Sequence, residues 1–176
     1  MGVGTEVKIA RRILTDVAVL GGLIPIIAAS SVGPGTRAPS VQLQVSDGTI
    51  VQTADLLGKV VLLDFWASWC PPCKTSFPAL DALYRREHVR GLEVLAINLD
   101  EQRKDAEAFL RTHPHMMPVA FDRQGKSPIA FAVKGMPSSV LIDRTGTIRF
   151  VHEGYSAKTL DRYREEIDLL LSEKRP

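Results

Sequence analysis

From Ala38 onward, the apolar residues of the chain alternate between strand-like and helix-like spacing. The runs Val60–Trp66 and Leu92–Leu99 are almost continuously apolar, which is typical of central strands that are covered on both faces. Apolar and polar residues alternate on either side of an Asp-Gly turn signal at positions 47 and 48, which predicts a β-hairpin. The remaining strands are predicted at residues 118–121, 139–142 and 147–151.

Helical spacing follows both long apolar runs. Helices are predicted after Cys73 and at residues 101–112, 127–133 and 156–172. The residues expected to point inward are Phe77, Leu80, Leu83, Tyr84, Ala106, Phe109, Leu110, Leu160, Tyr163, Ile167, Leu170 and Leu171. Strands separated by helices pair in parallel through right-handed crossovers, whereas hairpins add antiparallel strands. The sequence therefore predicts an α/β sandwich with a mixed central sheet.

The amino end has a different composition. Basic residues within the first 12 positions precede an uncharged run at 17–29, and small residues follow up to position 31. This order is typical of a secretory signal, and the run is shorter than the roughly 20 residues that span a bilayer. An uncleaved membrane anchor in residues 13–31 and an ordinary buried helix are the alternatives. We expect a signal peptide or anchor at 1–31, a linker at 32–37 and one domain at 38–176, located in the periplasm.

Composition excludes several classes of function. The formal net charge is +2 and the charges are scattered, so nucleic acid and a membrane surface are poor candidates for the main partner. The chain has 2 cysteines, Cys70 and Cys73, too few for a disulfide-rich scaffold.

The two cysteines lie three positions apart, where an apolar strand gives way to a helix. Backbone N–H groups and the helix dipole favour a thiolate at a helix start, and Pro71 and Pro72 suit the first helical positions. The spacing thus gives an attacking and a resolving thiol on one helical turn. Half of a zinc site, a purely structural disulfide and two inert thiols are the weaker alternatives.

The segment Asp64-Phe65-Trp66-Ala67-Ser68-Trp69-Cys70-Pro71-Pro72-Cys73-Lys74 resembles the active site of thioredoxins. The Pro-Pro pair and the signal-like amino end resemble the TlpA-like members of that family. Residues 133–137 are similar to the family's cis-proline loop, and residues 141–146 to the hairpin that follows it. The resemblance extends from Ala38 to about Leu171. It implies a thioredoxin-like three-layer sandwich with an amino-terminal β-hairpin extension.

The resemblance also implies roles for individual residues. Cys70 would attack a partner disulfide and Cys73 would resolve the mixed disulfide. Asp64 would be the buried carboxylate that takes the proton of Cys73; an Asp that reaches water at a strand edge is the alternative. The expected substrate-binding residues are Trp69, Pro71, Pro72, Met136 and Pro137, although Pro137 could instead sit in an ordinary turn.

The sequence departs from the TlpA-like pattern at three positions and from thioredoxin at a fourth. Ser76 replaces a glutamate that many members carry, and Ser138 and Ser139 follow the proline where members of the cytochrome c maturation group often have an acid. Ala96 stands where thioredoxin has a lysine beside its buried acid. The three serines weaken an assignment to apocytochrome reduction.

We therefore expect an exported, monomeric thiol–disulfide oxidoreductase that reduces protein disulfides and is itself reduced by a membrane electron donor, without cofactor or metal. The pathway could be cytochrome c maturation or periplasmic redox homeostasis. The alternatives are a thiol oxidase or isomerase, and a copper-handling module that uses Cys70 and Cys73. A peroxidase of the peroxiredoxin type is excluded, because Ala67 and Leu63 occupy the positions of its threonine or serine and its proline. The segment 113–117, with two His and two Met, is interpreted as loop and core rather than as a copper site.

Overall fold

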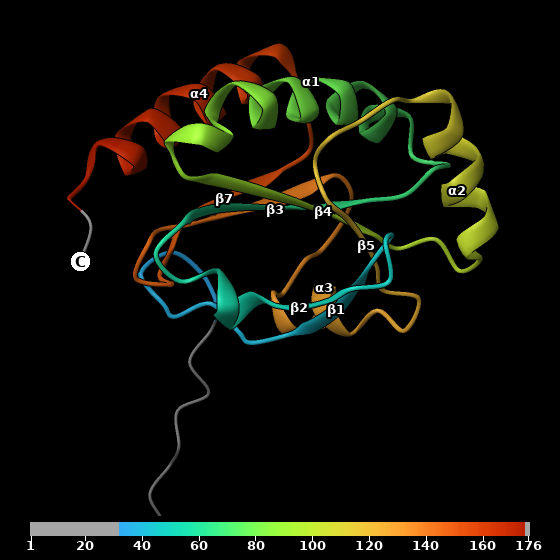
Figure 1. Cartoon of the computed structure of the whole chain (residues 1–176), viewed down its shortest axis with the longest axis horizontal. Helices are drawn as coiled ribbons and strands as arrows, with labels where there is room; N and C mark the ends of the chain where they lie inside the picture. The colour runs from blue at the N-terminus through green and yellow to red at the C-terminus, as the bar shows by residue number, and fades with distance from the viewer. Residues whose placement is uncertain (1–31, 175–176) are drawn as a thin grey trace, which may run out of the picture.

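The computed structural model describes residues 32–174 as one sheet with helices on both faces (Figure 1). The strands are β1 (Gln42–Val45), β2 (Ile50–Gln52), β3 (Val60–Trp66), β4 (Leu92–Asn98), β5 (Val119–Phe121), β6 (Ser138–Ile142) and β7 (Ile148–Glu153). The helices are α1 (Pro71–Glu87), α2 (Arg103–Thr112), α3 (Lys126–Ala130) and α4 (Ala157–Ser172), with short 3₁₀ turns at Thr53–Leu56 and His88–Arg90. The predicted signal peptide or anchor at 1–31 lies outside the described residues.

The sheet has the order β2-β1-β5-β4-β3-β6-β7 and is mixed, as predicted. β3, β4 and β5 pair in parallel, so their carboxyl ends meet at one edge of the sheet. β6 runs antiparallel to both β3 and β7, which places its first residues at the same edge. At the other side, β1 and β2 pair antiparallel around the Asp47-Gly48 turn, and β1 joins β5.

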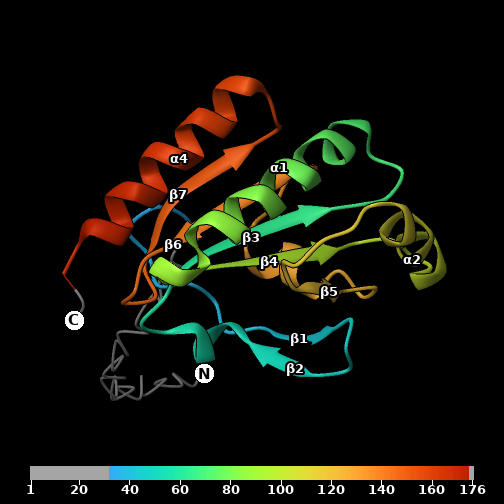
Figure 2. The same cartoon turned by 45° about the horizontal axis from the view of Figure 1, so that its top comes forward.

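Two apolar clusters hold the helices on the sheet. α1 and α4 lie side by side over one face, with α2 beside them, and α3 lies on the opposite face (Figures 1 and 2). Alternate residues of β3 divide between the clusters: Leu62 and Trp66 face α1 and α4, whereas Leu63 and Phe65 face the α3 side. Any polar residue between Leu62 and Trp66 on the first face is therefore enclosed in the core.

Three of the predicted helices have different bounds in the structure, and α2 begins at Arg103, two residues later than expected. The third helix is shorter than the expected 127–133, because Ala132 adopts a left-handed φ of 53°. The N–H groups of Ala132 and Val133 close the helix end by donating to the carbonyls of Ile129 at 3.2 Å and Pro128 at 2.8 Å. The last helix begins at Ala157, one residue later than expected, and Ser156 caps it by accepting a hydrogen bond from the Thr159 N–H.

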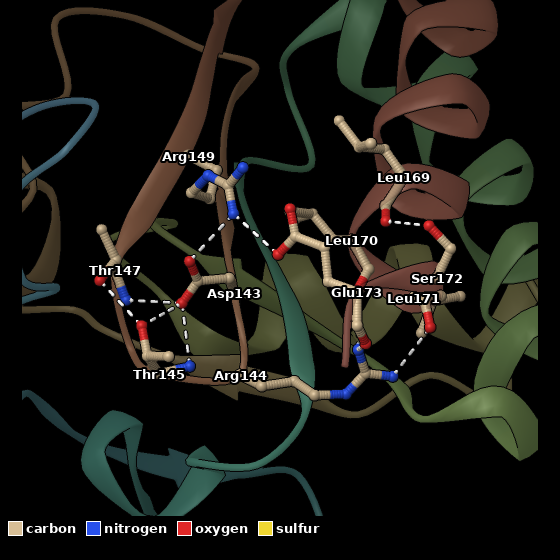
Figure 3. Close-up of polar contacts among 10 residues, drawn as sticks. All are labelled: Asp143, Arg144, Thr145, Thr147, Arg149, Leu169, Leu170, Leu171, Ser172 and Glu173. Carbon is tan, nitrogen blue, oxygen red and sulfur yellow. Dashed lines mark hydrogen bonds and ion pairs between the residues drawn. The ribbon is translucent and has the colours of Figure 1, made fainter. Parts of the chain in front are cut away.

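Arg144 fastens the carboxyl end of α4 to the β6–β7 turn (Figure 3). Its buried guanidinium donates to the carbonyl of Leu170 at 2.7 Å, of Glu173 at 3.1 Å and of Leu171 at 3.2 Å. A helix leaves its last carbonyls without intrahelical partners, so these bonds satisfy groups that would otherwise lack one. The position of α4 on the sheet is thus fixed at its far end as well as by its apolar face.

Among residues 32–174, none of the helices combines the length and the apolar character needed to cross a bilayer.

Candidate active site

Cys70 and Cys73 form a disulfide at the start of α1, directly beyond the carboxyl end of β3. Cys70 occupies the N-cap position, and Pro71 and Pro72 occupy the first two helical positions, as predicted. The sulfur of Cys70 therefore lies where backbone N–H groups and the helix dipole stabilise negative charge. Cys70 is 3% exposed and Cys73 is fully buried, so a partner protein can reach the sulfurs only by contacting the residues that surround them.

The loop that leads into Cys70 is held by a buried carboxylate. The Ser68 N–H donates to both oxygens of Asp100, at 3.2 and 3.1 Å, and the Asn98 amide donates to Asp100 at 2.9 Å. Asp100 reaches Ser68 because β4 ends beside β3, with Asn98 in register with Trp66. Asn98 and Asp100 were not among the site residues predicted from the sequence. The signal that could have found it is a pair of polar side chains directly after a buried strand, at the edge where the cysteines lie.

Asp64 lies on β3 between Leu62 and Trp66, on the face that α1 and α4 cover, and is 1% exposed. Its Oδ1 accepts a hydrogen bond of 2.8 Å from the Ser139 hydroxyl, and its Oδ2 has no hydrogen-bonding partner within the described chain. Burial raises the pKa of Asp64 to about 7, and the Ser139 hydrogen bond opposes part of that rise. Ala96 is its register partner on β4, so no cation lies opposite it there.

The proline loop lies at the same edge of the sheet as the cysteines. Ser138, the first residue of β6, is in register with Phe65 near the end of β3. The Met136–Pro137 peptide bond is cis, and Pro137 is buried with its carbonyl accepting from the Gly154 N–H at 2.7 Å. In residues 32–174, the backbone N–H and C=O of half-buried Met136 have no hydrogen-bonding partner. They are free to pair with an extended segment of another protein.

The remaining predicted site residues divide between the rim and the interior. Trp69 is 65% exposed, and Pro71 and Pro72 are also exposed beside Cys70. Ser76 is buried and donates to the Cys73 carbonyl at 3.1 Å, so it serves the helix backbone instead of presenting a charge. An apolar rim around buried sulfurs suits contact with a protein surface.

The segment His113–Met117 lies beside α1, where it contacts the side chain of Asp81. That carboxylate accepts from the backbone N–H groups of Met116 at 2.6 Å and Met117 at 2.9 Å, and Met117 is buried. Within the part of the chain that the structure describes, no three His, Cys, Asp or Glu side chains gather in a way that could hold a metal ion.

Comparison with known proteins shows the relationship of the chain. A sequence model of the AhpC/TSA family matches residues 34–151. The thiol-disulfide oxidoreductase ResA of Oceanobacillus iheyensis is 36% identical over 132 residues, which cover 73% of this chain and 68% of that protein.

Solved structures agree with the fold. A crystal structure of a Chlorobium tepidum protein, proposed to be the thiol:disulfide interchange protein DsbE, has a TM-score of 0.78 at 39% identity. The match covers 81% of this chain and 100% of that chain. The thioredoxin domain of a thiol-disulfide oxidoreductase from Bacteroides vulgatus is 20% identical, with a TM-score of 0.69 over 78% of this chain and 99% of that chain. The predicted thioredoxin-like fold is confirmed.

Replacing Asp64 with Asn should remove a pH-dependent loss of stability. Because the folded pKa of about 7 exceeds the ordinary value of 3.8, the native state keeps a proton that the unfolded chain releases as pH rises through this window. The free energy of unfolding should fall by roughly 4 kcal/mol between about pH 4 and pH 8 through this group alone, and the Asn variant should lack that fall. Urea unfolding of the disulfide-bonded chain at both pH values measures it.

Asp161→Asn is the control for that experiment, because Asp161 lies on the exposed side of α4 and its removal changes the net charge equally. The control should keep the wild-type pH dependence. An Asp64→Asn chain that retains the wild-type dependence would contradict the raised pKa.

Proposed function

The chain belongs to the AhpC/TSA family and is a thiol–disulfide oxidoreductase, and we propose that it works outside the cytoplasm as a reductant of disulfide bonds in partner proteins. The observation that carries this proposal is the Cys70–Cys73 disulfide at the start of α1, with both sulfurs buried behind an apolar rim. A disulfide that closes so short a loop adds little stability, so its chemistry is the better reason for it.

The proposed reaction begins with the reduced pair. The Cys70 thiolate attacks one sulfur of the partner disulfide, forms a mixed disulfide and releases the other partner sulfur as a thiolate that takes a proton from water. Asp64 then accepts the proton of Cys73, and the Cys73 sulfur attacks Cys70. The mixed disulfide breaks, the second partner sulfur leaves as a thiolate that takes a proton from water, and the Cys70–Cys73 disulfide forms. Two electrons have passed from the chain to its partner, and a dithiol donor must return them.

Partner contact is proposed to occur at the rim. The exposed side chain of Trp69 offers an apolar surface next to Cys70. The backbone of Met136, which has no hydrogen-bonding partner among residues 32–174, offers a strand-pairing site, and its side chain packs against the cluster that contains Cys70. Pro71 and Pro72, which are exposed beside Cys70, extend this surface, and the buried Pro137 supports it next to Met136.

Export is proposed from the order of basic, apolar and small residues in positions 1–31. In an oxidising compartment the pair is oxidised continually, so a reductant there requires a membrane electron donor of the thiol–disulfide type. Because the serines at positions 76, 138 and 139 replace acids, general redox homeostasis is favoured over cytochrome c maturation. We propose a monomer, released by signal cleavage or tethered to the membrane by residues 13–31.

The equilibrium reduction potential of the Cys70–Cys73 pair tests the direction of the reaction. In glutathione or dithiothreitol buffers we expect a value near or below roughly −250 mV, toward the thioredoxin end of the known range. A value of about −120 to −180 mV would make the chain an oxidant or isomerase. If no disulfide forms at all while the pair retains copper, the function would be metal handling.

Fusion of residues 1–37 to alkaline phosphatase, an enzyme that folds only after export, tests the location. The fusion should be active in intact bacteria. A second fusion carrying Leu23→Arg and Ile26→Arg should be inactive, because charges within the apolar run block its entry into the membrane. Equal activity of the two fusions, or none in either, would contradict export by this segment.

Trp69→Ala tests the rim. We expect kcat/KM for a disulfide-bonded protein such as insulin to fall about tenfold, as for an aromatic anchor of an interface, with little change for a small disulfide such as hydroxyethyl disulfide. Val89→Ala is the matched control, because Val89 is 88% exposed but follows the far end of α1. Equal losses with the two substrates would show that Trp69 shapes the cysteines and does not bind the partner.

A further inference from the structure

We infer that Ser139 and Tyr163 are positioning residues that form an uncharged hydrogen-bond relay to Asp64, anchoring its Oδ1 and leaving its Oδ2 to exchange the proton with Cys73. This inference deepens the proposed function and rests on it, because it concerns the base of the resolving step.

The relay links three elements of the fold. Ser139 on β6 is the register partner of Asp64 on β3, so the two side chains lie beside each other on the face that α4 covers. The Ser139 hydroxyl lies 2.8 Å from Asp64 Oδ1 and 2.7 Å from the Tyr163 hydroxyl of α4. All three residues are at most 1% exposed, so water does not compete for these bonds.

Counting hydrogens fixes the direction of the relay. An ionised carboxylate only accepts hydrogen bonds, so the single hydroxyl proton of Ser139 must point to Asp64. Ser139 Oγ therefore accepts from Tyr163, because the phenol O–H is the one hydroxyl proton of the relay that is left. Burial, and next the charge of Asp64, raise the pKa of Tyr163, so the phenol keeps that proton. The donors thus run from Tyr163 through Ser139 to Asp64.

This direction distinguishes the two oxygens of Asp64. Oδ1 accepts from Ser139 whether the carboxyl group is ionised or protonated, so nothing in the relay moves during the reaction. Oδ2 is buried without a partner in the described residues, on the face that carries Cys73. In the resolving step the S–H bond of Cys73 breaks and the proton passes to Oδ2, while the Cys73 sulfur bonds to Cys70 and the partner thiolate leaves. Reduction by the donor reverses the transfer.

The relay stabilises the carboxylate without introducing a charge. Ala96 occupies the place opposite Asp64 on the β4 side, where thioredoxin has its lysine, so the protein stabilises a buried anion with two hydroxyl dipoles instead. A hydrogen bond to an ionised group favours that form over the neutral one, which offsets part of the effect of burial. Asp64 is thereby kept ionisable near neutral pH, where a base for a thiol is most useful.

Other titratable groups face this part of the core and must be kept constant in a test. From α1 they are the cysteines; from α4, Tyr163 and Glu166; from β7, His152; and from the β7–α4 turn, Tyr155, whose raised pKa includes an effect of Asp64. His152 bonds to Glu166 at 2.6 Å, and its ring packs edge-on against that of Tyr163 at 4.9 Å. All of these residues are retained in a Ser139 variant, and among them only Tyr163 loses a hydrogen bond, the one to Ser139.

The test is a titration of the Asp64 carboxyl carbon by ¹³C NMR in the disulfide-bonded full chain. Ser139→Ala should move the midpoint upward by about one pH unit, and Tyr163→Phe should move it upward by less, because it weakens the relay one bond further away. Ser139→Thr should keep the wild-type midpoint, because threonine retains the hydroxyl group. Ser138→Ala is the matched control: that hydroxyl donates to the Gly135 carbonyl and not to Asp64, so the midpoint should not change.

The kinetic readout is the lifetime of the mixed disulfide with a disulfide-bonded peptide, measured by acid quench across pH. The profile of Ser139→Ala should shift upward by the same amount, which makes resolution about fivefold slower at pH 7. An unchanged midpoint in both Ser139→Ala and Tyr163→Phe would overturn the relay while leaving the proposed base in place. Unchanged resolution in Asp64→Asn would instead overturn the base, and the inference with it.

Discussion

The pairing of β3 with a parallel strand on one side and an antiparallel strand on the other governs the whole active site. The parallel neighbour ends where β3 ends, so Asn98 and Asp100 arrive beside the loop of Cys70. The antiparallel neighbour begins there, so the loop of Pro137 reaches the same edge, and Ser139 falls next to Asp64. A change in register on either side would separate the cysteines from their supports and the carboxylate from its donor.

Asp64 shows how the protein balances stability against reactivity. A carboxylate in an apolar layer is unfavourable when ionised. This free-energy penalty raises the pKa of Asp64 to about 7, so the group can remain protonated in the core below that pH. Asp100 and Asp81 are also buried, but each accepts several hydrogen bonds and holds a loop. In this chain a buried carboxylate with several donors holds a loop, whereas Asp64, with one donor among the described residues, has a raised pKa.

Most elements of the fold could be predicted from local patterns in the sequence. The limits of β3 and the start of β4 follow from almost continuously apolar runs, and the helix start at the cysteines follows from the strand that ends before them. The hydrogen bonds that link Tyr163, Ser139 and Asp64 could not be predicted from such local patterns. Tyr163 was expected only as an inward residue of the last helix, and Ser139 was noted only for the acid it replaces. Their meeting depends on cross-strand register and on the packing of α4, which no local spacing encodes.

The end of α3 was missed for a similar reason, since a left-handed residue at Ala132 leaves no mark in apolar periodicity. Asn98 and Asp100 were missed because two strands distant in sequence must be aligned before their ends can be compared.

The fastening of α4 by Arg144 has a practical consequence. Tyr163 reaches Ser139 only while α4 keeps its place along the sheet, and the carbonyls that Arg144 holds belong to Leu170, Leu171 and Glu173, at the very end of the described chain. A truncation or an affinity tag placed just after α4 can thus shift Tyr163 away from Ser139. The change would reach the surroundings of Asp64 although it is made at the opposite end of the helix from the sulfurs.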